Sequence, residues 1–256
     1  MYFKNKRGQV TMYIIIALVI VGAAVLILLF RPQLEGIAGV DFDPSSYLKK
    51  CIEPEIKKNV KLLSEQGSYS NIEGFVLHNG EKYKYLCYSS EFYKTCVVQQ
   101  PALKNNFEKE LSILIKKNSE VCINNLKSEY EKRGYTFSIK NTDSSVEIIP
   151  EKIIIKLTSP FTISKDTSQT FENFNTEISS QIYEILFIAQ SIIDFEATYG
   201  DSETSLYIQY YPDISIEKNA LEDGTTLYKI SNVVSGEQFK FASRSIAWPP
   251  GYGLEQ

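Results

Sequence analysis

The sequence has few of the residues from which catalytic and metal sites are usually built. It contains a single histidine, His78, and it has no Cys-x-x-Cys pair, no Gly-x-Gly-x-x-Gly string and no Walker loop. A Ser-His-Asp or Cys-His site would have to use His78, which we expect to be exposed at the tip of a hairpin. The sequence therefore identifies no catalytic, cofactor-binding or metal-ligating residue, and we expect a protein that is not an enzyme and needs no cofactor.

Basic residues are too few in the body of the chain for nucleic-acid binding. Four of the 27 Lys and Arg residues lie in residues 1–31, which contain no acidic residue, so residues 32–256 carry all 31 Asp and Glu and a net charge of −8. Nucleic-acid binding depends on basic side chains that displace counterions from phosphates. The acidic body argues against a nucleic-acid partner.

One long stretch of the chain has no charged residue. It covers residues 8–30, and within it residues 12–30 are all apolar, Gly or Tyr. A helix of this length matches the ~30 Å hydrocarbon core of a bilayer, so we expect a single transmembrane helix with lipid as its partner. Basic residues precede it: Lys4, Lys6 and Arg7. The positive-inside bias places the N-terminus in the cytoplasm and residues 32–256 outside the cell membrane.

A cleaved secretory signal is an alternative reading of this stretch. A small-x-small cleavage pattern exists at Gly36-Ile37-Ala38. The apolar region of a secretory signal is usually only about 7–15 residues long. The longer run favours an uncleaved anchor.

A third reading comes from the residues around Gly8. The string Lys6-Arg7-Gly8-Gln9-Val10-Thr11, followed by the apolar run, resembles the class III signal peptide of archaeal type IV pilins and flagellins. The resemblance implies cleavage after Gly8, with Gln9 as the new N-terminus and the apolar helix building a filament core. Tyr13 stands where many pilins have Glu. The whole chain also loosely resembles uncharacterised membrane-anchored proteins of small-genome archaea, which brings no known activity.

Beyond the membrane segment, the hydrophobic pattern predicts an α+β ectodomain with a mixed helix and antiparallel-sheet fold. Asp43-Pro44 opens a helix that Pro54 should kink or divide. Further helices are expected at 101–118, 119–132 and 169–197, the last from apolar residues at spacings of three and four. A hairpin is expected around Asn79-Gly80, and strands at 135–140, 145–149, 151–158, 205–210, 213–217, 225–233 and 237–243. The period changes near residue 133, so we divide the chain into 1–31, 32–133 and 134–256.

All four cysteines lie in the first half of the ectodomain. An even number in an oxidising compartment suggests two disulfides, for which three pairings are possible. We favour Cys87–Cys96, which closes a short loop after the hairpin, and Cys51–Cys122, which ties the first helix to the last helix of that half. Four buried free thiols are the alternative.

Aromatic residues are abundant, with 17 Tyr and 14 Phe. Several cluster around the expected hairpin: Tyr83, Tyr85, Tyr88, Phe92 and Tyr93. Tyr-rich patches serve partner recognition, although strand propensity alone also favours Tyr. The sequence thus indicates a single-pass surface protein that binds an unknown protein or envelope partner. The alternatives are a pilin-like subunit that forms homo-oligomers, distinguished by its mature N-terminus, and an extracytoplasmic hydrolase with a carboxylate site.

The predicted topology has a direct test. Protease added outside sealed cells or spheroplasts should digest residues 32–256 and leave residues 8–30 intact, because the bilayer shields only the latter. Peptide mass spectrometry of the membrane fraction measures this, with a cytoplasmic protein as the control for sealing. Full protection of the body would contradict the predicted orientation.

Overall fold

The computed structural model describes residues 16–22, 25 and 43–249. The chain divides into two compact units, Met1–Pro44 and Ser45–Gln256. Residues 16–22 are helical. No helix within the described ranges is long and apolar enough to cross a bilayer. Most of the predicted transmembrane segment, together with the processing site at Gly8 and Gln9, lies outside the described residues.

Two long helices form the first part of the larger unit. Helix α2 (Pro44–Glu65) continues through Pro54 without ending, so the division expected there is wrong; apolar side chains on both sides of Pro54 are buried and hold the helix in place: Leu48, Ile52, Ile56, Val60 and Leu63. Helix α3 (Leu103–Lys132) is one helix rather than the two predicted. Its buried stripe runs unbroken from Leu103 to Tyr130, so nothing ends it before Gly134.

The first sheet has the strand order β1-β2-β10-β9-β8, with β3 paired to β2. Its strands are β1 (Phe75–His78), β2 (Glu81–Tyr88), β3 (Val97–Val98), β8 (Ile214–Ala220), β9 (Thr225–Asn232) and β10 (Gln238–Arg244). Asn79 and Gly80 join β1 to β2 with φ values of 50° and 80°, as a type I′ hairpin turn requires. Strand β10 lies antiparallel to β9 and parallel to β2.

The second sheet is built around one long strand. Its members are β4 (Thr136–Ile139), β5 (Asp143–Ile149), β6 (Lys152–Ser164) and β7 (Ser168–Ser179). Strands β5 and β4 pair with successive parts of β6, whereas β7 pairs with β6 along its length. Thus β4 and β5 share one edge of β6, and β7 occupies the other.

Strand β7 corrects the prediction of a helix over residues 169–197. The apolar spacing of three and four that suggested a helix comes from a local irregularity in the pairing with β6, between Thr158 and Phe161. Because of it, Phe171 and Phe174 both stack on Phe161, with ring centroids 5.2 and 5.6 Å away. Two residues three apart therefore share one face of a strand, which in a regular strand they would not.

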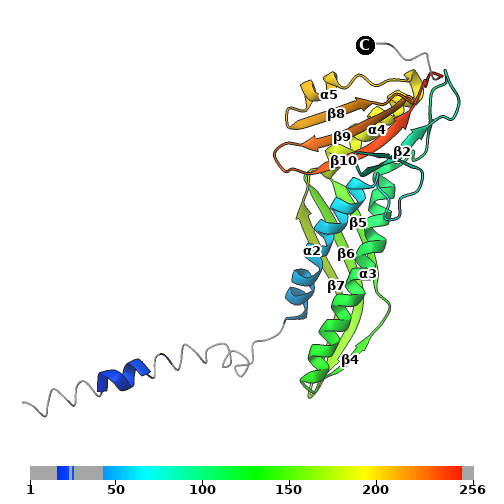
Figure 1. Cartoon of the computed structure of the whole chain (residues 1–256). Coiled ribbons are helices and arrows are strands. Elements are labelled where there is room, and N and C mark those ends of the chain that lie inside the picture. The colour runs from blue at the N-terminus through cyan, green and yellow to red at the C-terminus, as the bar shows by residue number, and fades with distance from the viewer. Residues whose placement is uncertain (1–15, 23–24, 26–42, 250–256) are drawn as a thin grey trace, which may run out of the picture. The chain divides into compact units, whose positions relative to one another are not determined.

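The helix that was predicted there begins later. Helix α4 (Ile182–Tyr199) packs against the first sheet through β10, β9 and β2, as Figure 1 shows. Gly200 ends it with φ of 88°, and its N–H bonds the Glu196 carbonyl over 3.0 Å. A Cβ at Gly200 would lie 1.9 Å from Ile246 Cδ1, so both conformation and space require glycine. Helix α5 (Ser205–Tyr210) replaces the strand expected at 205–210.

The α+β class is confirmed for the described part of the unit Ser45–Gln256. The boundary expected near residue 133 falls inside the unit Ser45–Gln256. Several contacts cross it, among them the pairing of β2 with β10 and the packing of α3 against β5 and α4. Figure 1 shows α2 and α3 alongside β5, β6 and β7.

Both predicted disulfides are present. Cys51–Cys122 joins α2 to α3 with a Cα–Cα distance of 6.1 Å, and Cys87–Cys96 links the end of β2 to the residue before β3 over 5.3 Å. All four cysteines are thus accounted for, and the alternative of free thiols is wrong.

Removing the two bridges should have unequal effects. The Cys51→Ser/Cys122→Ser variant should lose about 4 kcal/mol of unfolding free energy and the Cys87→Ser/Cys96→Ser variant about 3 kcal/mol, according to the chain-entropy account of loop closure. The reason is that the bridged residues are 71 and 9 positions apart. Urea unfolding of the full chain in detergent, followed by circular dichroism, measures both. A reversed order would contradict this account.

Candidate functional site

The short disulfide holds a loop whose backbone is fixed at several points. Residues 88–95 lie between Cys87 and Cys96, and three hydrogen bonds tie them to the end of β10 and the chain beyond it. The Ser89 N–H donates to the Arg244 carbonyl over 3.0 Å, the Tyr93 N–H to the Ala247 carbonyl over 2.9 Å, and the Ile246 N–H to the Lys94 carbonyl over 2.8 Å. Such a loop presents its side chains in a preorganised arrangement.

The loop and the chain after β10 expose four aromatic rings, and two of these rings contact one arginine. Tyr93 and Trp248 are each 53% exposed, and their rings meet edge to face with centroids 5.0 Å apart. The guanidinium carbon of Arg244 lies 5.5 Å from the Phe92 ring centroid and 6.0 Å from that of Tyr88. We call these five residues the Arg244 cluster: Tyr88, Phe92, Tyr93, Arg244 and Trp248.

Backbone carbonyls and ring faces hold Arg244 in place. Its Nε donates to the Asp223 carbonyl over 3.1 Å, and its Nη1 donates to the Ser89 carbonyl. Within the described ranges no carboxylate lies within 4.0 Å of its guanidinium. In the part of the chain that the structure describes, the half-buried Arg244 guanidinium therefore has no ion-pair partner, and it lies beside the Tyr88 and Phe92 rings in cation–π contact.

The structure divides the aromatic patch that the sequence indicated. Tyr88, Phe92 and Tyr93 belong to the Arg244 cluster. Tyr83 is only 9% exposed and packs with Leu227 and Ala242 in the core. Tyr85 is half-buried, and its hydroxyl lies 2.9 Å from Thr225 Oγ1. These two tyrosines contribute to the packing of the sheet and not to the exposed aromatic patch.

Sequence reasoning missed Arg244 and Trp248, which come from the other end of the chain. The pairing of β2 with β10 places Arg244 directly opposite Tyr88. No local pattern around Arg244 marks this position. His78, which we expected to be exposed, is half-buried at the end of β1, with Nε2 3.0 Å from Asn79 Nδ2.

A buried carboxylate lies beneath the cluster. Glu196 is 1% exposed and accepts hydrogen bonds from the Tyr228 hydroxyl, from Ser243 Oγ over 2.9 Å and from the Ser202 N–H over 3.2 Å. Ser243 Oγ also lies 3.6 Å from Cys96 Sγ. Burial raises the pKa of Glu196 above its ordinary value, although these hydrogen bonds oppose the shift. Glu196 joins α4, β9 and β10, and it supports the disulfide loop.

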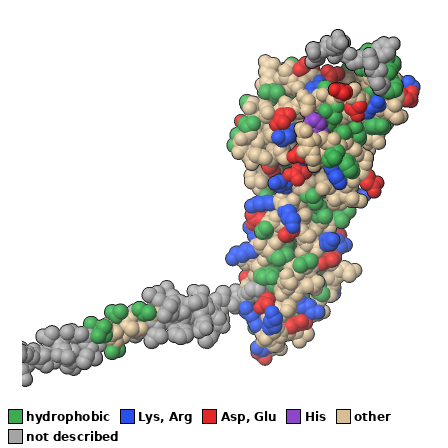
Figure 2. All heavy atoms as spheres, viewed as in Figure 1, with side chains coloured by type: hydrophobic (Ala, Val, Ile, Leu, Met, Phe, Trp, Pro, Cys, Tyr) green, Lys and Arg blue, Asp and Glu red, His purple; other side chains and the backbone are tan. Residues whose placement is uncertain are grey.

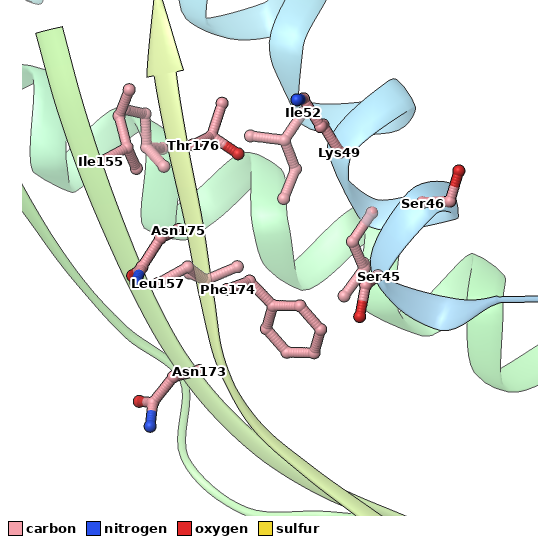
Figure 3. Close-up of a pocket in the computed structure, with 12 residues that line it drawn as sticks. Ser45, Ser46, Lys49, Ile52, Ile155, Leu157, Asn173, Phe174, Asn175 and Thr176 are labelled. Carbon is pink, nitrogen blue, oxygen red and sulfur yellow. The ribbon is translucent and has the colours of Figure 1, made fainter.

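Two hollows lie elsewhere, between α2 and β7. The first measures about 340 Å³ and the second about 480 Å³, and Figure 3 shows the first. Of their lining residues only Glu237 is acidic, and its carboxylate accepts bonds from Ser180 Oγ and the Gln181 N–H. No group of His, Cys, Asp and Glu that fits a metal ion occurs in the described part of the chain. The hydrolase alternative stays a prediction without a located carboxylate pair.

Comparisons with known proteins provide no relative. No family model, no curated protein and no solved structure matches the chain. The function is therefore argued from the residues and their geometry.

Replacing Glu196 should change how stability depends on pH. A carboxyl whose pKa is raised on folding binds its proton more tightly in the folded state, so its contribution to stability is lost as pH rises through the folded pKa. The Glu196→Gln variant should lack this loss, and its unfolding free energy should fall less than that of the wild type between pH 4.5 and pH 8. Glu196→Ala should cost about 2–4 kcal/mol because three buried donors lose their acceptor. Urea unfolding across this pH range measures both, with Glu172→Gln as the exposed control; parallel wild-type and Glu196→Gln curves would contradict the assignment.

Proposed function

We propose that the chain is a single-pass, membrane-anchored extracytoplasmic protein whose ectodomain binds a protein partner without catalysing a reaction. The Arg244 cluster is the observation that carries this proposal. Exposed Trp and Tyr side chains near a half-buried Arg have the composition of binding hot spots. The disulfide and the hydrogen bonds of the loop lower the entropy that such a surface would lose on binding.

The chemistry of the cluster favours a protein surface as partner. Tyr88, Tyr93 and Trp248 combine large apolar area with polar edges, so they tolerate exposure in the free protein and bury well in a complex. Arg244 offers a positive charge that is already oriented. The net charge of the body is negative, and Figure 2 shows acidic and basic side chains interspersed over the face drawn. Such a surface fits a partner that brings a carboxylate and apolar side chains to the cluster.

The proposed membrane anchor is argued from the sequence alone. The uncharged run over residues 8–30, with Lys4, Lys6 and Arg7 before it, supports an N-terminus in the cytoplasm and a body outside. The presence of two disulfides fits an oxidising compartment. The lipid bilayer is then the first partner of the chain.

A pilin-like subunit is the second candidate, supported by the residues around Gly8. Cleavage there would give a mature protein that begins at Gln9 and assembles through its apolar helix. Mass spectrometry of the N-terminal peptide from native membranes distinguishes the two. A peptide that spans Gly8 and Gln9 at full abundance supports the permanent anchor.

Site-specific photocrosslinking tests partner binding. A benzoylphenylalanine in place of Tyr93 should give a discrete adduct in the native membrane, whereas the same group at Tyr210, which is 79% exposed, should not. Adding Arg244→Glu should reduce the Tyr93 adduct by about tenfold, a loss of about 1.4 kcal/mol in binding. Equal adducts at both positions, or an adduct that Arg244→Glu leaves unchanged, would contradict the proposal.

A further inference from the structure

Strand β7 leaves one hydrogen-bonding edge of the second sheet open. It pairs with β6 on one side, and no strand within residues 43–249 pairs with its other side. It extends from Ser168 to Ser179 and contains no proline and no lysine, which are common protections of edge strands. The other sheet ends in β1, which has four residues, and in β8, which contains Glu217 and Lys218. Among the described strands, β7 is thus a long edge whose outward-facing backbone groups have no strand partner.

The two hollows between α2 and β7 run beside this edge. The inward side chains of β7 remain half-buried there: Phe174, Thr176 and Ile178. Their partners on β6 are fully buried: Leu157, Ile155 and Ile153. Figure 3 shows the Phe174 ring lying between β7 and α2. The inner face of the sheet is therefore fully covered at β6 and only partly covered at β7.

Lysines of α2 form the far side of the hollows. Lys49 lines the first hollow, and Lys57 and Lys61 line the second. The ion pairs of Lys57 with Glu53 (3.0 Å) and of Lys61 with Glu65 (3.9 Å) are exposed, so they hold these charges only weakly. Basic side chains gather over α2 on the face drawn in Figure 2. The border opposite β7 thus offers three lysines, whereas Glu237 at the end of the second hollow is already bonded to Ser180 and Gln181.

We propose that the β7 edge binds an extended segment of another protein by strand addition. Main-chain hydrogen bonds to β7 give affinity, and alternate side chains of the added strand point into the hollows. Apolar side chains at these alternate positions would complete the inner face beside Phe174 and Ile178. An acidic side chain at one inward position would meet the lysines of α2. The partner is therefore a segment with alternating apolar residues and one inward carboxylate.

A second copy of the chain fits the edge less well. Strand β7 carries Glu172 and Glu177 and no basic residue. Two β7 strands side by side would bring four carboxylates together. Glu177 is paired with Lys152 of β6 over 2.9 Å, but neither β7 strand carries a cation to place opposite the other's glutamates, which disfavours pairing. This site is separate from the Arg244 cluster, so either proposal can fail without the other.

Binding of designed peptides to the full chain in nanodiscs tests the proposal. The probe is the fluorescent peptide DTVSVTVSVT, whose valines and single aspartate alternate with polar residues, and the control is DVVTTVVSST, which has the same composition without the alternation. Anisotropy should show that the probe binds at least about tenfold more tightly than the control. Hydrogen exchange of β7 amides should slow when the probe binds. Equal binding of both peptides, or unchanged exchange in β7, would overturn the proposal.

Matched variants locate the site. The Lys49→Glu/Lys57→Glu/Lys61→Glu variant should weaken binding of the probe by at least about fivefold. Lys50→Glu/Lys58→Glu, on the same helix but away from the hollows, should not. Phe174→Ser should also weaken binding, whereas Phe187→Ser, at an exposed position of α4, should not. Equal losses in the two lysine variants would overturn the assignment, and so would a dimer of the free chain in sedimentation that the probe dissociates, because a second copy would then occupy the edge.

Discussion

The parallel pairing of β2 with β10 is the contact on which the rest of the first sheet depends. It joins strands that are about 150 residues apart in sequence and places Ser243 opposite Cys87 and Arg244 opposite Tyr88. Parallel neighbours require a long connection, and here that connection contains α3, the whole second sheet and α4. This register therefore places Ser243 in the core on one face of β10 and Arg244 in the surface cluster on the other face.

The buried side of this register explains why a carboxylate is tolerated in the core. Ser243 donates to Glu196, and its hydroxyl also contacts Cys96. A buried carboxyl without donors would be costly, but Glu196 has three donors, from β9, β10 and the chain after α4. Because Ser245 Oγ also donates to the Glu196 carbonyl and accepts from the Cys96 N–H, helix, strand and disulfide loop form one polar network. This network therefore joins the loop that carries the exposed rings to α4 and β10.

The sequence correctly predicted those features that depend on residues close together in the chain. The Asn79-Gly80 turn, the ends of β9 and β10, and the short disulfide each follow from residues close in sequence. The failures at β7 and α5 have a different cause. In β7 the irregular pairing with β6 places Phe171 and Phe174 on the Phe161 ring, and the spacing of apolar residues alone does not distinguish this irregular strand from a helix. In α5 the Tyr207 hydroxyl lies 2.7 Å from Ser191 Oγ of α4, so a tertiary contact supports a short helix where alternation indicated a strand.

The candidate site could likewise be predicted only where its residues are close together in sequence. Three of its rings lie within one disulfide loop and could be predicted as a group, because the loop keeps them close in space. Arg244 and Trp248 reach them only through the β2–β10 register. Tyr83 and Tyr85 were grouped with them by proximity in sequence, yet strand β2 directs them into the sheet, toward Leu227 and Thr225.

Helices cover the two sides of the second sheet unequally, and the Cys51–Cys122 disulfide explains why this difference persists. Helix α3 packs against β5 and β4, while α2 borders β7 only across the two hollows. If α2 moved toward β7, half-buried side chains such as Phe174 and Ile178 would become fully buried, at a gain of about 1 kcal/mol each, since complete burial of a large apolar side chain from water gives about 1.5–3 kcal/mol. Cys51 lies one turn before Glu55, and both are joined to α3: Cys51 through the disulfide to Cys122, and Glu55 through a 3.1 Å hydrogen bond from Asn118 Nδ2. The two links fix α2 against α3, so α2 cannot move to close the hollows, and the apolar area beside the β7 edge stays available for association.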